Sequence, residues 1–357
     1  MSVTPLGFVR TPEKGLAPLR WAGTGWTVDD RPPHVAALRE LRGLEVEWPG
    51  HEVPLDGVLE LAAAGVPLTA THAEPWVPAG LAALLTDRDW LGHAGDGGLR
   101  GLADLRREEH SVRLRRLAHP VAPPPKVSIL MSTRRPALVG FALAQMERQL
   151  DVEAEVLLGL HGFAFEQVRE VVESCSLPVR WVEAEASMPF GEVLNQAAAP
   201  AEGDFLAKWD DDDWYGPRHL ADLVMALRYA QADVAGTTAE FFYLEPLRTT
   251  IRRTTFSSGA RYPSEVYADH VAGGTIMVPR KTFHDVGGFP ALPSAVDREF
   301  LKAAHQSGAR IYRTHGLTYV LRRGLGSEHT WQLPLSHFLK VAANQWHGFR
   351  PSLLMEA

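Results

Sequence analysis

The chain has 357 residues, which is enough for two or three domains that each bury a core of their own. Hydrophobic residues make up 45% and charged residues 22% of the chain, as in ordinary globular proteins. The formal net charge of -7 argues against a general nucleic-acid binder, and the single cysteine, Cys175, excludes an internal disulfide and a cysteine-rich zinc site.

Residues 1–20 contain no apolar core flanked by positive charge, so no secretory leader is predicted. No run of about 18 apolar residues occurs, so no transmembrane helix is expected. A lone cysteine also fits a reducing compartment. We therefore expect a cytoplasmic protein, with peripheral attachment to the inner face of the membrane as the alternative.

Residues 1–118 are expected to form a small α/β domain. Within it, residues 58–68 predict a helix that ends at Gly65 and is followed by a strand, and a longer helix is expected over residues 101–118. Residues 119–125 contain four prolines, which lack amide donors and favour an extended spacer. This segment predicts a linker and a domain boundary.

Strands alternate with helices from residue 126 onwards. Strands are expected over residues 126–133, 155–160, 179–182 and 205–209, and helices over residues 138–149, 165–174 and 191–198. Later strands are expected over residues 234–238, 240–243, 273–278 and 310–313, with a loop over residues 252–267. The alternation predicts a mostly parallel sheet flanked by helices. This domain is expected to cover residues 126–331, and a helical tail to cover residues 332–357.

Four consecutive carboxylates, residues 210–213, follow a short apolar strand and precede an amphipathic helix. They lie at the carboxyl end of a strand, which is the edge of an α/β sheet where ligands bind. Because adjacent like charges repel, we interpret them as a site for Mg²⁺ or Mn²⁺ together with phosphates. The alternative is a solvated loop that caps the following helix. The spacing does not match a calcium loop of the EF-hand type.

Several short segments occur in order along residues 126–331. They are Thr133-Arg134-Arg135-Pro136, the pair Gly191 and Asn195, Asp210-Asp211-Asp212, Gly273-Gly274, Gly287-Gly288-Phe289 and Val296-Asp297-Arg298-Glu299-Phe300. In this order they resemble the inverting glycosyltransferases of family 2. The resemblance implies the GT-A fold. It also implies a metal-dependent transfer of a sugar, with inversion, from a nucleoside-diphosphate sugar to an acceptor hydroxyl.

The same resemblance implies roles for individual residues. Asp297 is expected to be the general base that takes the proton of the acceptor hydroxyl. Asp210 and Asp212 are expected to hold Mn²⁺ or Mg²⁺ against the departing diphosphate, with His329 as a further ligand. Contacts to the nucleotide sugar are expected from Thr133, Arg135, His161, Asn195, Asp210 and Asp211.

Other roles are open for some of these residues. Asp297 can instead cap the helix that begins there, and Glu299 is the neighbouring candidate for the base. His329 can be an ordinary core or surface histidine. His161 stands where the family has an acidic residue after its second strand, and a UDP-sugar is the favoured donor. The acceptor can be a glycan, a lipid or a small molecule.

Two other classes of function are also open. A nucleotidyltransferase places acids at strand ends around Mg²⁺, but it would be expected to carry a glycine-rich phosphate loop after its first strand. Residues 132–136 do not form such a loop. A catalytically inactive binding module would use the same carboxylates for protein contacts only.

A second resemblance lies in the first region. Glu60, Ala63, Gly65 and Pro67 match the Glu-x-x-Ala-x-Gly-x-Pro segment of the carboxyl-terminal domain of GT-B glycosyltransferases, and His110 with Arg113 or Arg115 loosely matches its closing helix. Residues 1–118 therefore resemble a truncated GT-B domain, which implies a scaffolding or acceptor-recognition role without catalysis. An unrelated small α/β domain is the alternative, since short helix-glycine-strand patterns arise often by chance.

Overall fold

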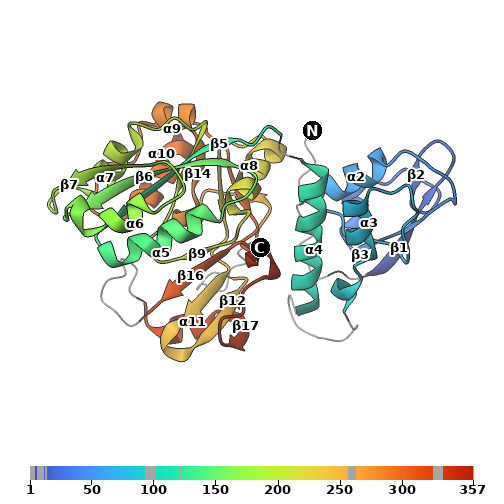
Figure 1. Ribbon diagram of the computed structural model, residues 1–357. Helices are drawn as coiled ribbons and strands as arrows, with labels where there is room; N and C mark the ends of the chain where they lie inside the picture. Colours follow the sequence, from blue (N-terminus) through green and yellow to red (C-terminus); the bar gives the residue numbers. More distant parts are fainter. Residues whose placement is uncertain are drawn as a thin grey trace. The chain divides into compact units, whose positions relative to one another are not determined.

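The computed structural model describes residues 5, 12, 14–92, 102–120, 122–255, 263–324 and 333–356. The chain divides into two compact units, Met1–Pro120 and Val121–Ala357. Figure 1 shows both units, and the division falls within the proline-rich segment predicted as a linker. No helix in the described parts of the chain is long and apolar enough to span a membrane.

The first unit is a small α/β fold. Its strands form one sheet in the order β2-β1-β3-β4, in which β1 and β3 run parallel, as do β3 and β4. The elements are β1 (Lys14–Trp21), β2 (Trp26–Thr27), α1 (Val35–Leu38), β3 (Leu41–Glu47), α2 (Asp56–Ala63), β4 (Leu68–Thr69), α3 (Ala79–Thr86), η1 (Asp89–Leu91) and α4 (Leu102–Ala118). A core that includes Leu44, Val58 and Leu114 joins the sheet to α2 and α4.

The two segments that resemble a GT-B domain lie in contact within this unit. The Ser111 hydroxyl of α4 donates a hydrogen bond to the Gly65 carbonyl over 2.9 Å. His110 Nε2 lies 2.7 Å from the Leu68 carbonyl, and the imidazole stacks on Trp90. Burial lowers the pKa of His110, so the ring is neutral and donates through Nε2. These contacts tie α4 to the turn that follows α2.

The second unit is built on a mixed, mostly parallel sheet of eight strands in the order β13-β15-β10-β14-β8-β5-β6-β7. Parallel pairs join β5 to β6, β6 to β7, β5 to β8 and β10 to β15. The strands are β5 (Lys126–Thr133), β6 (Glu153–His161), β7 (Val179–Ala184), β8 (Phe205–Lys208), β10 (Val234–Thr237), β13 (Val266–Tyr267), β14 (Met277–Pro279) and β15 (Ile311–Thr314).

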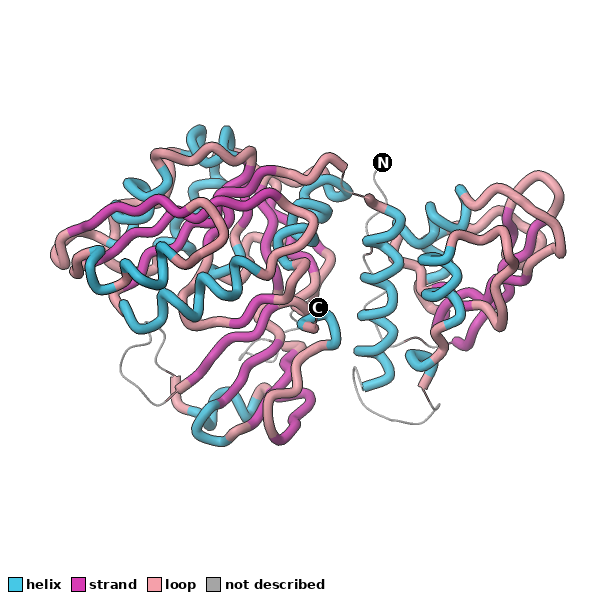
Figure 2. The backbone as a smooth tube through the Cα atoms, viewed as in Figure 1, coloured by secondary structure: helices cyan, strands magenta, loops and turns pink. Residues whose placement is uncertain are grey.

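Helices cover both faces of this sheet, as Figure 2 shows. Because successive strand residues point to opposite faces, Ile129 packs with one set of helices and Leu130 with the other. The first set is α5 (Pro136–Glu147), α6 (Arg169–Glu173) and α8 (His219–Ala230). The second set is α7 (Phe190–Ala198), α9 (Arg280–Val286) and α10 (Val296–Gln306). Both sheet faces are therefore buried, as the sequence predicts for this region.

A second sheet of five strands has the order β17-β12-β11-β16-β9. Its strands are β9 (Trp214–Tyr215), β11 (Phe241–Leu244), β12 (Thr249–Arg253), β16 (Tyr319–Arg323) and β17 (Ala342–His347). The segment predicted as a loop over residues 252–267 begins in β12 and ends in β13, and residues 256–262 lie outside the described part of the chain.

The tail differs from the predicted helical one. It contains the short helix α11 (Leu335–Lys340), then β17, then the turn η5 (Leu353–Met355). β17 pairs antiparallel with β12, and Trp346 stacks on Phe241 of the neighbouring strand β11. The exposed edge of β12 offers backbone hydrogen-bond partners to β17. Because these partners lie far away in the sequence, the local pattern of the tail does not predict the strand.

Candidate active site

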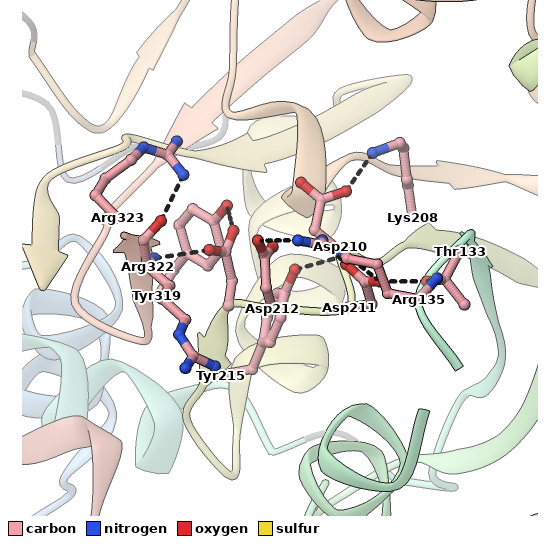
Figure 3. A network of polar contacts seen from close by, with 11 residues as sticks. Thr133, Arg135, Lys208, Asp210, Asp211, Asp212, Tyr215, Tyr319, Arg322 and Arg323 are labelled. Atoms are coloured by element: carbon pink, nitrogen blue, oxygen red, sulfur yellow. Dashed lines mark hydrogen bonds and ion pairs between the residues drawn. The ribbon is translucent and has the colours of Figure 1, made fainter. Parts of the chain in front are cut away.

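The acidic stretch connects the two sheets of the second unit. β8 lies between β5 and β14 in the large sheet, and β9 is an edge strand of the small sheet. Residues 210–213 occupy the turn between β8 and β9. The capping alternative does not hold, because Arg218 is the N-cap residue of α8 and makes no side-chain cap bond. In Figure 3, Asp211 and Asp212 lie against Arg135, whereas Asp210 lies toward Lys208.

Asp211 and Asp212 share one cation, Arg135. The guanidinium donates from Nε to Asp211 Oδ2 over 3.1 Å and from Nη1 to Asp212 Oδ2 over 3.0 Å. Thr133 donates its hydroxyl to Asp211 and accepts the Arg135 backbone N–H. Burial disfavours the guanidinium, but the bonds and charges of the two acids outweigh it and raise the Arg135 pKa. Thr133, Arg135 and Asp211, which are predicted to contact the nucleotide sugar, therefore form one hydrogen-bonded group in which Thr133 and Asp211 are buried and Arg135 is partly exposed.

Asp213 points away from this group into the small sheet. It is buried, accepts a hydrogen bond from the Tyr319 hydroxyl and accepts the Arg322 backbone N–H over 2.9 Å. Burial, reinforced by the negative charge of Asp212, raises the Asp213 pKa to about 8. The carboxyl is therefore largely protonated at neutral pH and anchors β16 to the acidic turn.

This shift predicts that stability depends on pH through Asp213. Between its ordinary pKa of 3.8 and about 8, the unfolded chain ionises this carboxyl while the folded chain holds the proton. Stabilisation by Asp213 is thus complete at low pH and is lost as the pH rises through this window. Asp213→Asn should remove this loss. The wild type should lose roughly 1 to 4 kcal/mol more of its free energy of unfolding between pH 5 and pH 8 than the variant does.

Urea unfolding at pH 5 and pH 8 measures this difference. The matched control is Asp285→Asn, because Asp285 is an exposed acid paired with Lys281. An Asp213→Asn protein whose stability changes with pH as steeply as that of the wild type would contradict the assignment.

Asp210 is the member of the stretch with a substantially exposed side chain, at 38%. Its Oδ1 lies 2.7 Å from Lys208 Nζ, and its backbone N–H donates to the Tyr215 hydroxyl over 2.9 Å. Tyr215 donates in turn to the Gly274 carbonyl over 2.9 Å and stacks on Trp209. These bonds fix the backbone from which the Asp210 carboxylate projects.

Asp297, the predicted base, lies beside the same lysine. Its Oδ1 is 3.3 Å from Lys208 Nζ, and its side chain is 32% exposed. The capping role does not hold for Asp297 either, because Ala295 is the N-cap residue of α10. Burial and the charge of Asp210 raise the Asp297 pKa, against the opposing effect of Lys208. A raised pKa makes a carboxylate a stronger proton acceptor.

The other predicted site residues have different surroundings. His161 ends β6, is buried, and lies with Nε2 2.9 Å from an Arg134 guanidinium nitrogen. Burial and Arg134 lower the His161 pKa, so the imidazole is neutral, and its contact with a nucleobase stays a prediction. His329 lies outside the described residues.

Asn195 makes structural hydrogen bonds, and its contact with the nucleotide sugar stays a prediction. Its amide nitrogen donates to the Phe289 carbonyl over 2.7 Å, and its amide oxygen accepts the Phe289 N–H over 2.9 Å. The turn that it closes contains Gly287 and Gly288 at φ values of +90° and +72°. Asn195 thus holds a glycine turn that precedes α10.

Sequence reasoning did not identify Lys208 and Tyr319. Lys208 could have been found from the sequence, because it lies in an otherwise apolar strand and buried lysines are almost always paired with an acid. No local signal marks Tyr319, because it lies 106 residues from Asp213 in the sequence.

Two acids of this turn are the candidate ligands for a divalent cation that also binds phosphate. No group of three or more His, Cys, Asp or Glu side chains is arranged to hold a metal ion within the described ranges. Mg²⁺ commonly uses one or two carboxylates together with substrate phosphates, so a set of two acids is sufficient. Asp210, with its exposed carboxylate, and Asp212, whose side chain is 11% exposed, are the two residues that would hold it.

Comparisons with known proteins give a limited likeness. No family model matches the sequence, and no curated protein matches it. The chain is similar to the mannosyltransferase PcManGT from Pyrobaculum calidifontis in complex with GDP-Man and Mn²⁺, at 19% identity and a TM-score of 0.47, over 59% of this chain and 60% of that one. It is also similar to S. aureus TarS 1-349, at 21% identity and a TM-score of 0.41, over 55% and 60% of the two chains.

The complex of TarS 1-349 with UDP-GlcNAc matches at 18% identity and a TM-score of 0.43, over 60% of this chain and 64% of that one. The chain therefore spans less than two thirds of each of these structures. Because all three TM-scores are below 0.5, the function proposed below depends on the geometry of the site.

Proposed function

We propose that residues 126–331 form a GT-A glycosyltransferase of the family 2 type, which transfers a sugar with inversion from a nucleoside diphosphate to an acceptor hydroxyl. One observation carries the proposal. Asp210, from the acidic turn after β8, and Asp297, from the first turn of α10, both contact the buried Lys208. Asp210, the acid proposed for the diphosphate, and Asp297, the acid proposed for the acceptor, therefore lie in one cluster.

Asp297 is the proposed general base. As the acceptor oxygen forms a bond to the anomeric carbon, the bond from that carbon to the diphosphate oxygen breaks. The acceptor hydroxyl passes its proton to the Asp297 carboxylate, and the electron pair of the broken bond stays with the diphosphate. Attack from the face opposite the diphosphate inverts the anomeric carbon.

Asp212 and Asp210 are the proposed ligands of Mn²⁺ or Mg²⁺. A bound divalent cation stabilises the negative charge that develops on the leaving diphosphate. Arg135 holds Asp212 through a 3.0 Å hydrogen bond, and Lys208 holds Asp210 through one of 2.7 Å. Both carboxylates are therefore oriented before a donor binds, which limits the ordering that binding requires.

Thermal unfolding with nucleoside diphosphates tests the proposal. We expect UDP or GDP to raise the melting temperature in the presence of Mn²⁺, and EDTA to abolish the rise. A ligand at a hundred times its dissociation constant adds about 2.7 kcal/mol to the free energy of unfolding. A panel of UDP-linked and GDP-linked sugars then identifies the donor by release of the diphosphate, with a UDP-sugar as the favoured candidate.

Two results would contradict the proposal. One is the absence of any metal-dependent nucleotide stabilisation across the panel. The other is release of pyrophosphate from nucleoside triphosphates without release of diphosphate from any sugar nucleotide, which would identify a nucleotidyltransferase.

A further inference from the structure

Lys208 is a buried cation beneath two partly exposed acids. Its side chain is 3% exposed, whereas those of Asp210 and Asp297 are 38% and 32% exposed. Its ammonium lies 2.7 Å from Asp210 Oδ1 and 3.3 Å from Asp297 Oδ1. The lysine therefore draws one oxygen of each acid toward the same point.

The strand that carries Lys208 is rigidly held. β8 pairs with β5 on one side and β14 on the other, and the Lys208 N–H donates to the Ile276 carbonyl over 2.8 Å. The lysine therefore gives the two acids a common point of attachment to the centre of the large sheet.

A turn of two glycines holds the acids from the other side. A Cβ on Gly273 would lie 2.3 Å from Asp297 Oδ2, and a Cβ on Gly274 would lie 2.5 Å from Asp210 Oδ2. Each carboxylate therefore has one oxygen toward Lys208 and the other against the backbone of the turn η4 (Gly273–Thr275). Larger residues at either glycine would displace the acid beside it.

We propose that Lys208 is a positioning residue that fixes the distance between the acceptor-side acid Asp297 and the donor-side acid Asp210. The inference rests on the function proposed above, since it assigns Asp297 to the base and Asp210 to the donor. Productive transfer requires the reacting atoms to lie about 3 to 3.5 Å apart, and a displacement of about 1 Å can reduce the rate about a hundredfold. A single ammonium, hydrogen-bonded to Asp210 and ion-paired with Asp297, keeps the two acids at a fixed separation.

Steady-state kinetics of Lys208→Met with the donor found in the panel test this role. The variant retains the length and volume of the side chain but contacts neither acid through a charge. We expect kcat to fall by about a hundredfold while the donor KM changes by less than about threefold. The melting rise caused by Mn²⁺ with the nucleoside diphosphate should persist, because Asp212 stays bonded to Arg135 and the partly exposed Asp210 carboxylate is still present to bind the metal.

Lys208→Arg separates position from charge. It retains the positive charge, so the fold should be preserved, but it moves the donor atoms. A positioning role predicts a loss of kcat of about tenfold or more in this variant, with a nearly normal melting temperature. This variant also gives the answer if Lys208→Met does not fold. The matched control is Lys302→Met, because Lys302 is an exposed lysine on the same helix as Asp297 and should be close to wild type in every measurement.

The inference and the proposed function fail in different ways. A wild type that neither transfers sugar nor responds to nucleotides would refute the function. An active wild type whose kcat is retained within about threefold in both Lys208 variants would refute only the positioning role. A rise in donor KM at constant kcat would also refute it, because it would show that Lys208 serves donor binding.

Discussion

Asp297→Asn is expected to stop sugar transfer while leaving donor binding intact. The amide retains the shape of the carboxylate and can keep its oxygen beside Lys208, but it does not accept the proton of the acceptor hydroxyl. General base catalysis contributes about a hundredfold to ten-thousandfold, so kcat should fall by a factor in that range. The melting rise caused by Mn²⁺ and the nucleoside diphosphate should equal that of the wild type.

Glu299→Gln is the matched control for this variant. Glu299 lies in the same turn of α10, but its carboxylate bonds to Arg298 over 2.9 Å and lies 3.7 Å from Lys302, both of which are exposed. We expect its kcat to be close to that of the wild type. Full activity in Asp297→Asn would eliminate Asp297 as the base, and a loss confined to Glu299→Gln would assign the role to Glu299.

Asp212→Ala is expected to abolish the part of the nucleotide-induced stabilisation that requires the metal. At a hundred times the dissociation constant this part amounts to about 2.7 kcal/mol. The reason is that a cation on the diphosphate needs a carboxylate ligand from the protein, and Asp212 is the acid that Arg135 orients at the acidic turn. Thermal unfolding with UDP or GDP, with Mn²⁺ and with EDTA, measures the effect.

The fold itself should survive this substitution. Arg135 retains its hydrogen bonds to Asp211, so the guanidinium stays paired when Asp212 is removed. Asp285→Ala, which removes an exposed acid from a surface ion pair, should keep the full metal-dependent rise. A melting rise in Asp212→Ala that matches the wild type at every metal concentration would exclude Asp212 as a ligand.

Much of the large sheet follows from local sequence patterns. The strand predicted over residues 126–133 is β5 with the same bounds, and the strand predicted over residues 155–160 lies within β6. Residues of these strands are apolar on both faces because helices cover both sides of the sheet. The position of the acidic stretch at the end of β8 follows from the same patterns.

The separate roles of the four acids do not follow from those patterns. Because the four carboxylates are adjacent in the sequence, the sequence predicts that they repel each other and that a bound metal ion relieves this repulsion. In the structure, Arg135 pairs with two of them, Lys208 pairs with a third, and burial raises the pKa of the fourth, Asp213. Three of the four acids find their partners on segments that lie far away in the sequence: Arg135, which follows β5, and Tyr319 of β16.

Local composition and periodicity are sufficient to place most strands of the large sheet, the helices that cover it and the acidic turn, because hydrophobic burial acts on every residue of a segment in the same way. Apart from the pair of Lys208 and Asp210, which are two residues apart, the partners of the carboxylates depend instead on contacts between distant segments. Lys208 and Asp297 are 89 positions apart, and their 3.3 Å contact exists because α10 packs against the large sheet beside the glycine turn. A hydrogen bond depends on fractions of an ångström, so only the packed chain determines which of these side chains meet.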